Sequence, residues 1–297
     1  MPTRWHAGQT DDGSLMLKIF NKKQITPKEK MKAILGDYEL PSFPVIVMSA
    51  MEKVRDADAS NSEISELVAS DPGLSVRLLT TVNSAAYALK HKVNNIDHAV
   101  SLMGRGELES ILISVAVHEV MPKENIPVFD AQRFWGAAAR RAALARGLAD
   151  QIDPSSRSES YTAALLQDMA VPILAQQRAD DYGPVLERWY ANDFDLVTLE
   201  SETFDWDHAT VAMWMCDDWG FPDRIAEAIG AHHGTNDDLI ALPAVSLVGV
   251  LREQGESTGV EQLVESAYEN YGLSRDLVVE LVDTSFAAAE DIARMFA

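Results

Sequence analysis

The sequence predicts an all-α protein, a multi-helical bundle. Nearly every segment of the 297-residue chain repeats apolar residues at the three- and four-residue spacing of a helix. No stretch shows the regular apolar–polar alternation of a half-buried strand, and helix start signals recur along the chain. With 47% hydrophobic residues, such helices can bury a sizeable common core.

The first 36 residues are expected to form an N-terminal tail and a basic helical extension. Residues 1–14 carry no periodic pattern and are predicted to be disordered. Residues 15–36 hold six lysines and space Leu15 and Ile19 one helical turn apart, which predicts a short basic amphipathic helix. This helix could dock a partner protein or pack on the acidic body of its own chain; we favour the second interpretation, since solvated charge runs are common.

Clear helix start signals follow. The segment LPSFP interrupts the chain and is followed by a helix that runs to Arg55. Ser60 and Glu63 have the spacing of a capping box, in which each side chain bonds the backbone N–H of the other. Asp71 and Pro72 predict an N-cap followed by a proline at the first helical position.

The rest of the chain continues in the same way, and Gly220 and Gly234 stand where helix C-caps belong. We expect the helix that contains Pro172 to bend at that residue, because proline cannot donate to the helical hydrogen-bond ladder. The helices are predicted at 97–103, 107–120, 130–150, 160–177, 181–191, 196–203, 207–219, 222–233 and 238–253, with two or three more before the end.

Composition excludes several functions. The formal charge of −21 repels phosphate backbones and anionic lipids, so we expect neither nucleic-acid nor membrane partners. The N-terminus lacks the apolar core of a signal peptide, and no apolar run approaches the ~20 residues that span a bilayer. A cytoplasmic location is therefore expected. The single cysteine, Cys216, excludes an internal disulfide and zinc sites built on paired cysteines.

Three polar sites interrupt apolar helix stripes: Gln167 with Asp168, then His208, and then His232 with His233. Their spacing from neighbouring apolar residues places them on the buried faces of the predicted helices. Buried carboxylates and imidazoles are costly unless they pair, form hydrogen bonds or hold an ion. These five residues are therefore the candidate functional site.

Several sequence segments occur together in the order found in one known family. LPSFPVIVMSAMEKVRD, ISELVASDPGLSVRLLTTVNSAAYAL and VNNIDHAVSLMGRGELESILISVAV are followed by FWGAAARRAALARGLA, YTAALLQDMA and WDHATVAMWMCDDWGFPDRIAEAI, then AHH. This order resembles the HDOD domain over residues 37–235, which implies an HD-like helical bundle. Residues 236–297 are expected to form further helices packed on the same body.

HDOD domains are similar to the HD superfamily of metal-dependent phosphohydrolases, in which a His-Asp pair, a further histidine and a distal aspartate bind metal. The resemblance implies that Gln167 replaces the histidine of that pair while Asp168 is retained. It further implies that the other two ligand positions are lost, to Ala137 and Gly249. His208, His232 and His233 match extra ligand positions of the related HD-GYP phosphodiesterases, although GTNDDL lacks their Gly-Tyr-Pro signature.

An amide oxygen is a weak substitute for imidazole on a transition metal, so the losses predict a vestigial polar pocket with no catalytic residue, metal or other cofactor. Its default interpretation is a hydrogen-bonded network, although Asp168 and the three histidines could still gather one ion if the fold brings them together.

The resemblance implies a non-catalytic signalling or regulatory module that acts through protein contacts. Sensor kinases, response regulators and cyclic-dinucleotide enzymes are the implied bacterial partner classes, and the chain could also form a homo-oligomer. The alternative is a divergent metal-dependent phosphohydrolase acting on a nucleotide or cyclic nucleotide. A third class, a nucleic-acid-linked regulator, would require salt-sensitive retention of DNA or RNA, against the charge of −21.

Overall fold

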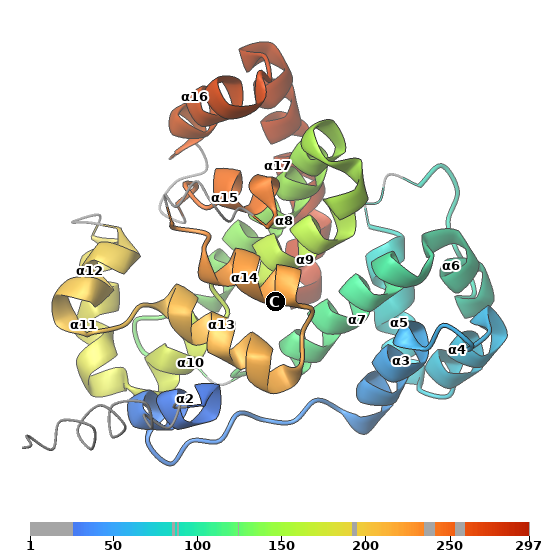
Figure 1. The fold of residues 1–297 in the computed structure, drawn as a ribbon, viewed down its shortest axis with the longest axis horizontal. Helices are drawn as coiled ribbons and strands as arrows, with labels where there is room; N and C mark the ends of the chain where they lie inside the picture. Colours follow the sequence, from blue (N-terminus) through green and yellow to red (C-terminus); the bar gives the residue numbers. More distant parts are fainter. Residues whose placement is uncertain are drawn as a thin grey trace, which may run out of the picture.

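The protein is a bundle of α-helices, and the residues that the structure describes contain no strand, as the sequence predicts (Figure 1). The computed structural model describes residues 26–84, 87, 89–123, 125–191, 195–234, 241–252 and 259–296. None of the helices within these ranges combines the length and apolar content that crossing a membrane requires.

The first group of helices begins where the sequence signals predict. In the structure Ser60 and Glu63 form the capping box, and the Asp71 carboxylate accepts from the Leu74 N–H at 2.7 Å. These helices lie together at one end of the molecule (Figure 1). They are α3 (Val45–Arg55), α4 (Asn61–Ala69), α5 (Pro72–Val82), α6 (Ile96–Met103) and α7 (Arg105–Val120).

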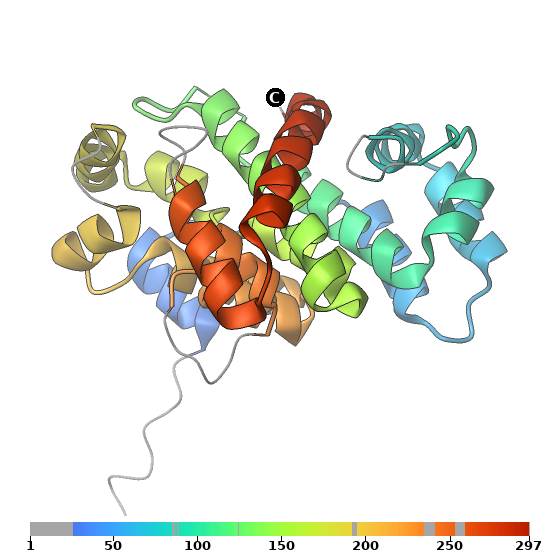
Figure 2. The ribbon, with the colours of Figure 1, turned by 90° about the horizontal axis from the view of Figure 1, so that it is seen from above.

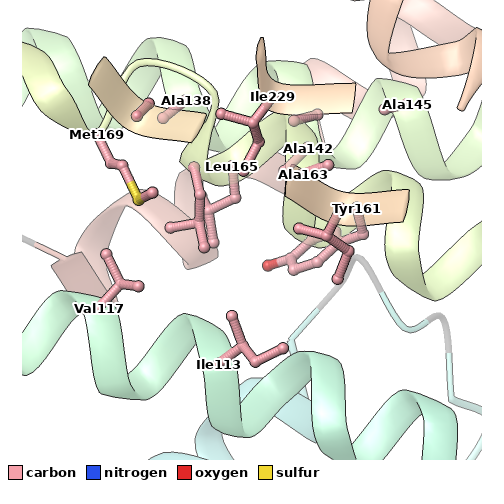
Figure 3. Packing of buried hydrophobic residues seen from close by; sticks show 14 of the residues in the cluster. Ile113, Val117, Ala138, Ala142, Ala145, Tyr161, Ala163, Leu165, Met169 and Ile229 are labelled. Atoms are coloured by element: carbon pink, nitrogen blue, oxygen red, sulfur yellow. The ribbon is translucent and has the colours of Figure 1, made fainter. Parts of the chain in front are cut away.

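The centre of the molecule is built around one long helix, α8 (Ala131–Ile152), whose alanines allow its neighbours to approach closely. In Figure 3, Leu165 of the helix that follows α8 lies between the α8 alanines Ala138 and Ala142 on one side and Ile113 of the helix that precedes α8 on the other. The other central helices are α9 (Arg157–Leu166), which packs on α7 and α8, α10 (Ala170–Gln177), α13 (His208–Trp219) and α14 (Asp223–Gly230).

The opposite end carries α11 (Ala179–Tyr190), α12 (Leu196–Thr203) and the N-terminal α2 (Pro27–Leu35). Helix α2 packs on α13, with the Lys30 ammonium 5.1 Å from the Trp214 ring centroid and Met31 buried. This part of the basic extension therefore packs on its own chain. The pairing of Leu15 with Ile19 lies outside the described residues.

Three helices follow the central group: α15 (Pro243–Val248), α16 (Val260–Tyr271) and α17 (Arg275–Phe296). Helices α15 and α17 both pack against α8, and α16 packs on α15 and α17. Viewed from above, α17 lies alongside α8 (Figure 2). The approach is close, since a methyl group added at Gly147 would lie 3.2 Å from the Leu281 side chain.

The predicted single helix over 160–177 is wrong in one respect, because it is broken at residues 167–169 instead of bent at Pro172. Proline has no N–H, so Pro172 cannot bond the Asp168 carbonyl four residues earlier. That carbonyl instead accepts from the Val171 N–H at 2.9 Å, in a tighter turn. The break therefore lies one turn upstream of the proline, at the candidate site.

Two further boundaries differ from prediction. The helix expected over 222–233 ends at Gly230, so His232 and His233 lie in the turn that follows, and Gly234 caps no helix. Of the helix expected over 238–253, the described part is helical only in α15. Gly220 does adopt the left-handed C-cap conformation, with φ 65°.

Candidate functional site

The Asp168 carboxylate and the imidazoles of His208, His232 and His233 meet at the centre of the molecule. One ligand-type atom from each of the four lies within 4.8 Å of the others. Asp168 Oδ1 is 3.2 Å from His208 Nε2 and 3.1 Å from His232 Nε2, and His208 Nε2 is 3.1 Å from His233 Nε2. The fold thus brings together four of the five candidate residues that the sequence singled out.

Each of these side chains is positioned by the end of a helix. Asp168 lies in the break between α9 and α10. His208 is the first residue of α13, whose start is fixed by Asp207 accepting from the Thr210 N–H at 2.7 Å. His232 and His233 lie in the turn after α14. Helix ends give the backbone freedom that lets these side chains converge from separate elements.

Arg141 is a further member of the site that the sequence interpretation missed. Its side chain is 4% exposed, and its guanidinium forms an ion pair with Asp168 Oδ2 and approaches the Leu251 carbonyl at 3.4 Å. Arg141 lies on α8 one helical turn after Ala137. The available signal was a pair of adjacent arginines within an alanine-rich helix, because a charge that is buried there requires a partner.

Glu200 and Tyr182 form a second layer that was also missed. Glu200 is fully buried on α12, and its Oε2 accepts from His208 twice, from Nδ1 at 2.7 Å and from the backbone N–H at 2.9 Å. Its other oxygen accepts from the Tyr182 hydroxyl. An acid within the short, otherwise ordinary helix 196–203 gave no distinctive sequence signal.

The charges in this network compensate one another. Burial alone would raise the pKa of Asp168, but Arg141 and the hydrogen bonds from His208 and His232 hold it well below its usual value. Burial alone would lower the pKa of His208, but Glu200 and Asp168 raise it to about 10. Two carboxylates thus face a guanidinium and an imidazolium, which makes the burial of all four groups tolerable.

The remaining predicted positions have different surroundings. The Gln167 side chain is 1% exposed, and its Oε1 has no hydrogen-bond partner within the described part of the chain. Ala137 is buried on α8. A Cβ atom placed on Gly249 would lie only 2.3 Å from the His232 carbonyl oxygen, so the backbone leaves no room for a carboxylate side chain there.

A cavity of about 470 Å³ adjoins the cluster. Its lining includes Arg141, Gln167 and the four converging side chains, together with Gln262 and Ser266 of α16. His233 is exposed, so the cavity provides a route from solvent to the cluster. A volume of this size is typical of small-molecule sites.

Of the metal sites that the family resemblance implies, these residues fit one ion and not two. Asp168 Oδ1 and three imidazole nitrogens are a chemically suitable donor set for a single ion. A second ion lacks donors, because Ala137 has no ligand atom and no side chain fits at Gly249. Asp168 Oδ2 is also already engaged by Arg141.

The helical bundle and its polar centre of Asp168 and histidines define a protein of the HD-like helical class. The comparisons identify the family: the HDOD domain model matches residues 40–235, and the chain belongs to the HDOD family. This confirms the resemblance inferred from the sequence.

The comparisons also give relatives of known structure. The chain is similar to an HDOD domain protein of unknown function from Geobacter sulfurreducens, with 20% identity, a TM-score of 0.72, and 91% of this chain and 97% of that chain covered. It is similar to a "Putative phosphohydrolase" from Shewanella amazonensis SB2B, with 19% identity and a TM-score of 0.68. That match covers 87% of this chain and 95% of that chain. It is also similar to a "Putative signal transduction protein" from Marinobacter aquaeolei VT8, with 22% identity and a TM-score of 0.67. That match covers 90% of this chain and 60% of that chain.

A curated relative is an uncharacterised protein of Treponema pallidum (strain Nichols), 23% identical over 211 residues. The match covers 70% of this chain and 40% of the relative, so the chain spans less than half the length of that protein. The solved structures share the fold at these identities.

Proposed function

We propose that this protein is a non-catalytic regulatory module of bacterial signal transduction that acts through protein contacts. The observation that carries the proposal is the Arg141–Asp168 ion pair, together with the lost ligand positions at Ala137 and Gly249. Hydrolysis by a metal pair requires carboxylates and imidazoles that bridge and flank two ions. Here the Arg141 guanidinium is paired with one carboxylate oxygen of Asp168, the single aspartate ligand that is retained.

The cytoplasmic setting and the partner classes belong to the same proposal. The name of the Marinobacter aquaeolei relative supports a role in signalling. Sensor kinases, response regulators and cyclic-dinucleotide enzymes are the proposed partner classes, and association with a second copy of the chain is an additional possibility to test. The net charge of −21 supports protein partners over nucleic acid.

A second candidate function is a divergent metal-dependent phosphohydrolase acting on a nucleotide or cyclic nucleotide. The observation that favours it is the four-donor cluster that lines the 470 Å³ cavity. One bound ion can activate water even without a second. In this candidate, Asp168 and the three histidines would hold the ion, which would supply a hydroxide nucleophile at neutral pH.

The two candidates are separated by an assay of phosphodiester hydrolysis. The full chain and its Asp168→Ala variant would be incubated with Mn²⁺ and, in turn, bis(p-nitrophenyl) phosphate and a cyclic dinucleotide. The regulatory proposal expects the same background rate for both proteins. Turnover by the wild-type chain that Asp168→Ala abolishes would refute it and support the hydrolase.

The partner classes are tested by cross-linking the tagged chain in its native cell, followed by affinity purification and mass spectrometry. We expect specific enrichment of proteins from the three named classes over a tag-only control. Salt-sensitive retention of DNA or RNA in place of such proteins would count against the proposal.

A further inference from the structure

One wall of the 470 Å³ cavity lies outside the family domain. The family model ends at residue 235, whereas Gln262, Ser266 and Asn270 of α16 belong to the cavity lining. These three residues are four apart in the chain, so they form one polar stripe along successive turns of α16. The buried residues of α16 lie on another side and are apolar: Leu263, Val264 and Ala267. The polar stripe thus lines the cavity and adds nothing to the apolar core.

The side chain of Gln167 brings an unsatisfied polar group to the same cavity. Gln167 is 1% exposed and lines the cavity, and its Oε1 accepts no hydrogen bond from the described residues. Arg141 Nε, a buried donor of another lining residue, also has no partner among them. Such groups are costly and rare in native proteins. A ligand that presents an N–H beside a C=O would supply the partner that each of them lacks.

The buried charges of the lining are already compensated within the protein. The Arg141 guanidinium is paired with Asp168, and the His208 imidazole is paired with Glu200 behind it. An ion that enters such a site loses its hydration and finds no uncompensated opposite charge, which is unfavourable. These pairs therefore favour an uncharged ligand.

The helix ends beside the cavity do not offer an anion site either. Helix N-termini attract anions, but the carboxylate of Asp195 caps α12 and that of Asp207 caps α13. Burial alone would raise the pKa of Asp195, but hydrogen bonds from Thr198 and the charge of Arg252 lower it. The exposed Arg252 is therefore close enough to balance the charge of Asp195, and both residues line the cavity.

The remaining lining combines apolar surface with amide side chains. Its apolar residues are Trp189, Leu196, Pro243, Leu247, Val250 and Leu251. A flat ring can bury its faces against such side chains while its polar edge forms hydrogen bonds. The amides of Gln167, Gln262 and Asn270 each present a donor beside an acceptor. The same pairing on a ligand is the edge of a lactam or a carboxamide.

We propose that the cavity binds an uncharged ring compound that carries an amide or lactam edge. Gln167 recognises this edge from the family domain, and the polar stripe of α16 contacts the compound from the C-terminal segment. The phosphohydrolase candidate instead requires recognition of a phosphate, so the two predict different ligands. A signalling role for the compound rests on the proposed regulatory function, whereas its binding can be measured without any partner protein.

The test is saturation-transfer difference NMR on the full chain. The neutral probes are nicotinamide and uracil, and their carboxylate counterparts are nicotinate and orotate, which keep the ring and add a negative charge. We expect at least one neutral probe to bind and its counterpart to bind about 10-fold more weakly or not at all, because the anion finds no uncompensated cation.

Two variants locate the binding. Gln167→Leu should abolish the probe signal while the midpoint of urea unfolding stays the same or rises, because the change removes a buried acceptor that has no partner. A merely structural role of Gln167 would lower that midpoint. Ser266→Trp should also abolish the signal by filling the cavity from α16. The matched controls, Gln177→Leu and Glu265→Trp, change exposed residues outside the lining and should bind like the wild type.

Several results would overturn the proposal: no binding of either neutral probe, equal binding of the carboxylate counterparts, or an unchanged signal in Gln167→Leu. Tighter binding of uridine monophosphate than of uracil would show recognition of a phosphate and would also overturn it. If Gln167→Leu fails to fold by circular dichroism, Ser266→Trp decides, because Ser266 is only half-buried. None of these results bears on the regulatory proposal, which the cross-linking experiment tests separately.

Discussion

Gly249 is the position where the structure makes its sharpest energetic prediction. A Cβ atom there would lie 2.3 Å from the His232 carbonyl oxygen, whereas ordinary contacts begin at about 3.4 Å. The backbone at Gly249 is right-handed helical, with φ −59° and ψ −22°, so alanine itself is unstrained. Any destabilisation must therefore come from the contact.

The size of the effect follows from two opposing contributions. Replacing glycine by alanine stabilises a compatible position by about 0.4–1 kcal/mol, because the unfolded chain loses freedom. Overpacking costs about 1–3 kcal/mol, and the upper end applies here because a backbone carbonyl cannot rotate away as a flexible side chain can. We expect Gly249→Ala to lower the free energy of unfolding by about 2 kcal/mol.

The assay is equilibrium unfolding in urea, followed by tryptophan fluorescence and by circular dichroism. The matched control is Gly183→Ala, within α11, where an added Cβ meets nothing within 4 Å. This control should be more stable than the wild type by about 0.5–1 kcal/mol. If Gly249→Ala is as stable as the control, the close approach of Gly249 to His232 is wrong.

Three further predictions concern other parts of the fold. Ser60→Ala, which removes the capping box on α4, should lower stability by about 1 kcal/mol in the same urea assay, with the exposed Ser62→Ala as control. Arg146→Met should cost about 3–5 kcal/mol, because it leaves the buried Glu107 carboxylate, otherwise paired at 2.7 Å, without its guanidinium. Burial alone would raise the pKa of Glu107, but Arg146 lowers this pKa below its ordinary value of 4.5. The ionised Glu107 therefore stabilises the fold above pH 4.5, and this stabilisation is lost as the pH falls through the lowered pKa. Unfolding free energy measured from pH 7 to pH 3 should therefore fall less steeply for Glu107→Gln than for the wild type, and equal slopes would contradict this.

Several helix starts and the end of α13 were predictable because their signals are local. The capping box of Ser60 and Glu63, the Asp71 cap and the left-handed Gly220 each depend on a few neighbouring residues. The all-α class was predictable for the same reason, since helical periodicity is visible within a window of one or two turns.

The end of α14 was less predictable because a tertiary packing contact competes with the helical periodicity. The apolar spacing continues from Ile225 to His233, yet the helix ends at Gly230 and the next residues turn into the site. The His232 carbonyl also lies directly against Gly249, a long-range contact that no short window contains.

The candidate site could be predicted for its conspicuous members only. Asp168 and the histidines stand out as polar residues within apolar stripes. Glu200 does not, because acids are frequent in this chain and its burial depends on how α12 packs against α11. Arg141 lies next to Arg140, and sequence alone does not say which arginine turns inward.

Helix α8 belongs to the family domain, where it packs on α9, and it also contacts the C-terminal segment through α15 and α17. It carries Arg141, which holds Asp168 in place, and Arg146, which pairs with Glu107 of α7. The C-terminal helix α17 therefore packs on the same helix that carries both buried guanidiniums, so the C-terminal segment supports the polar centre from outside the cavity.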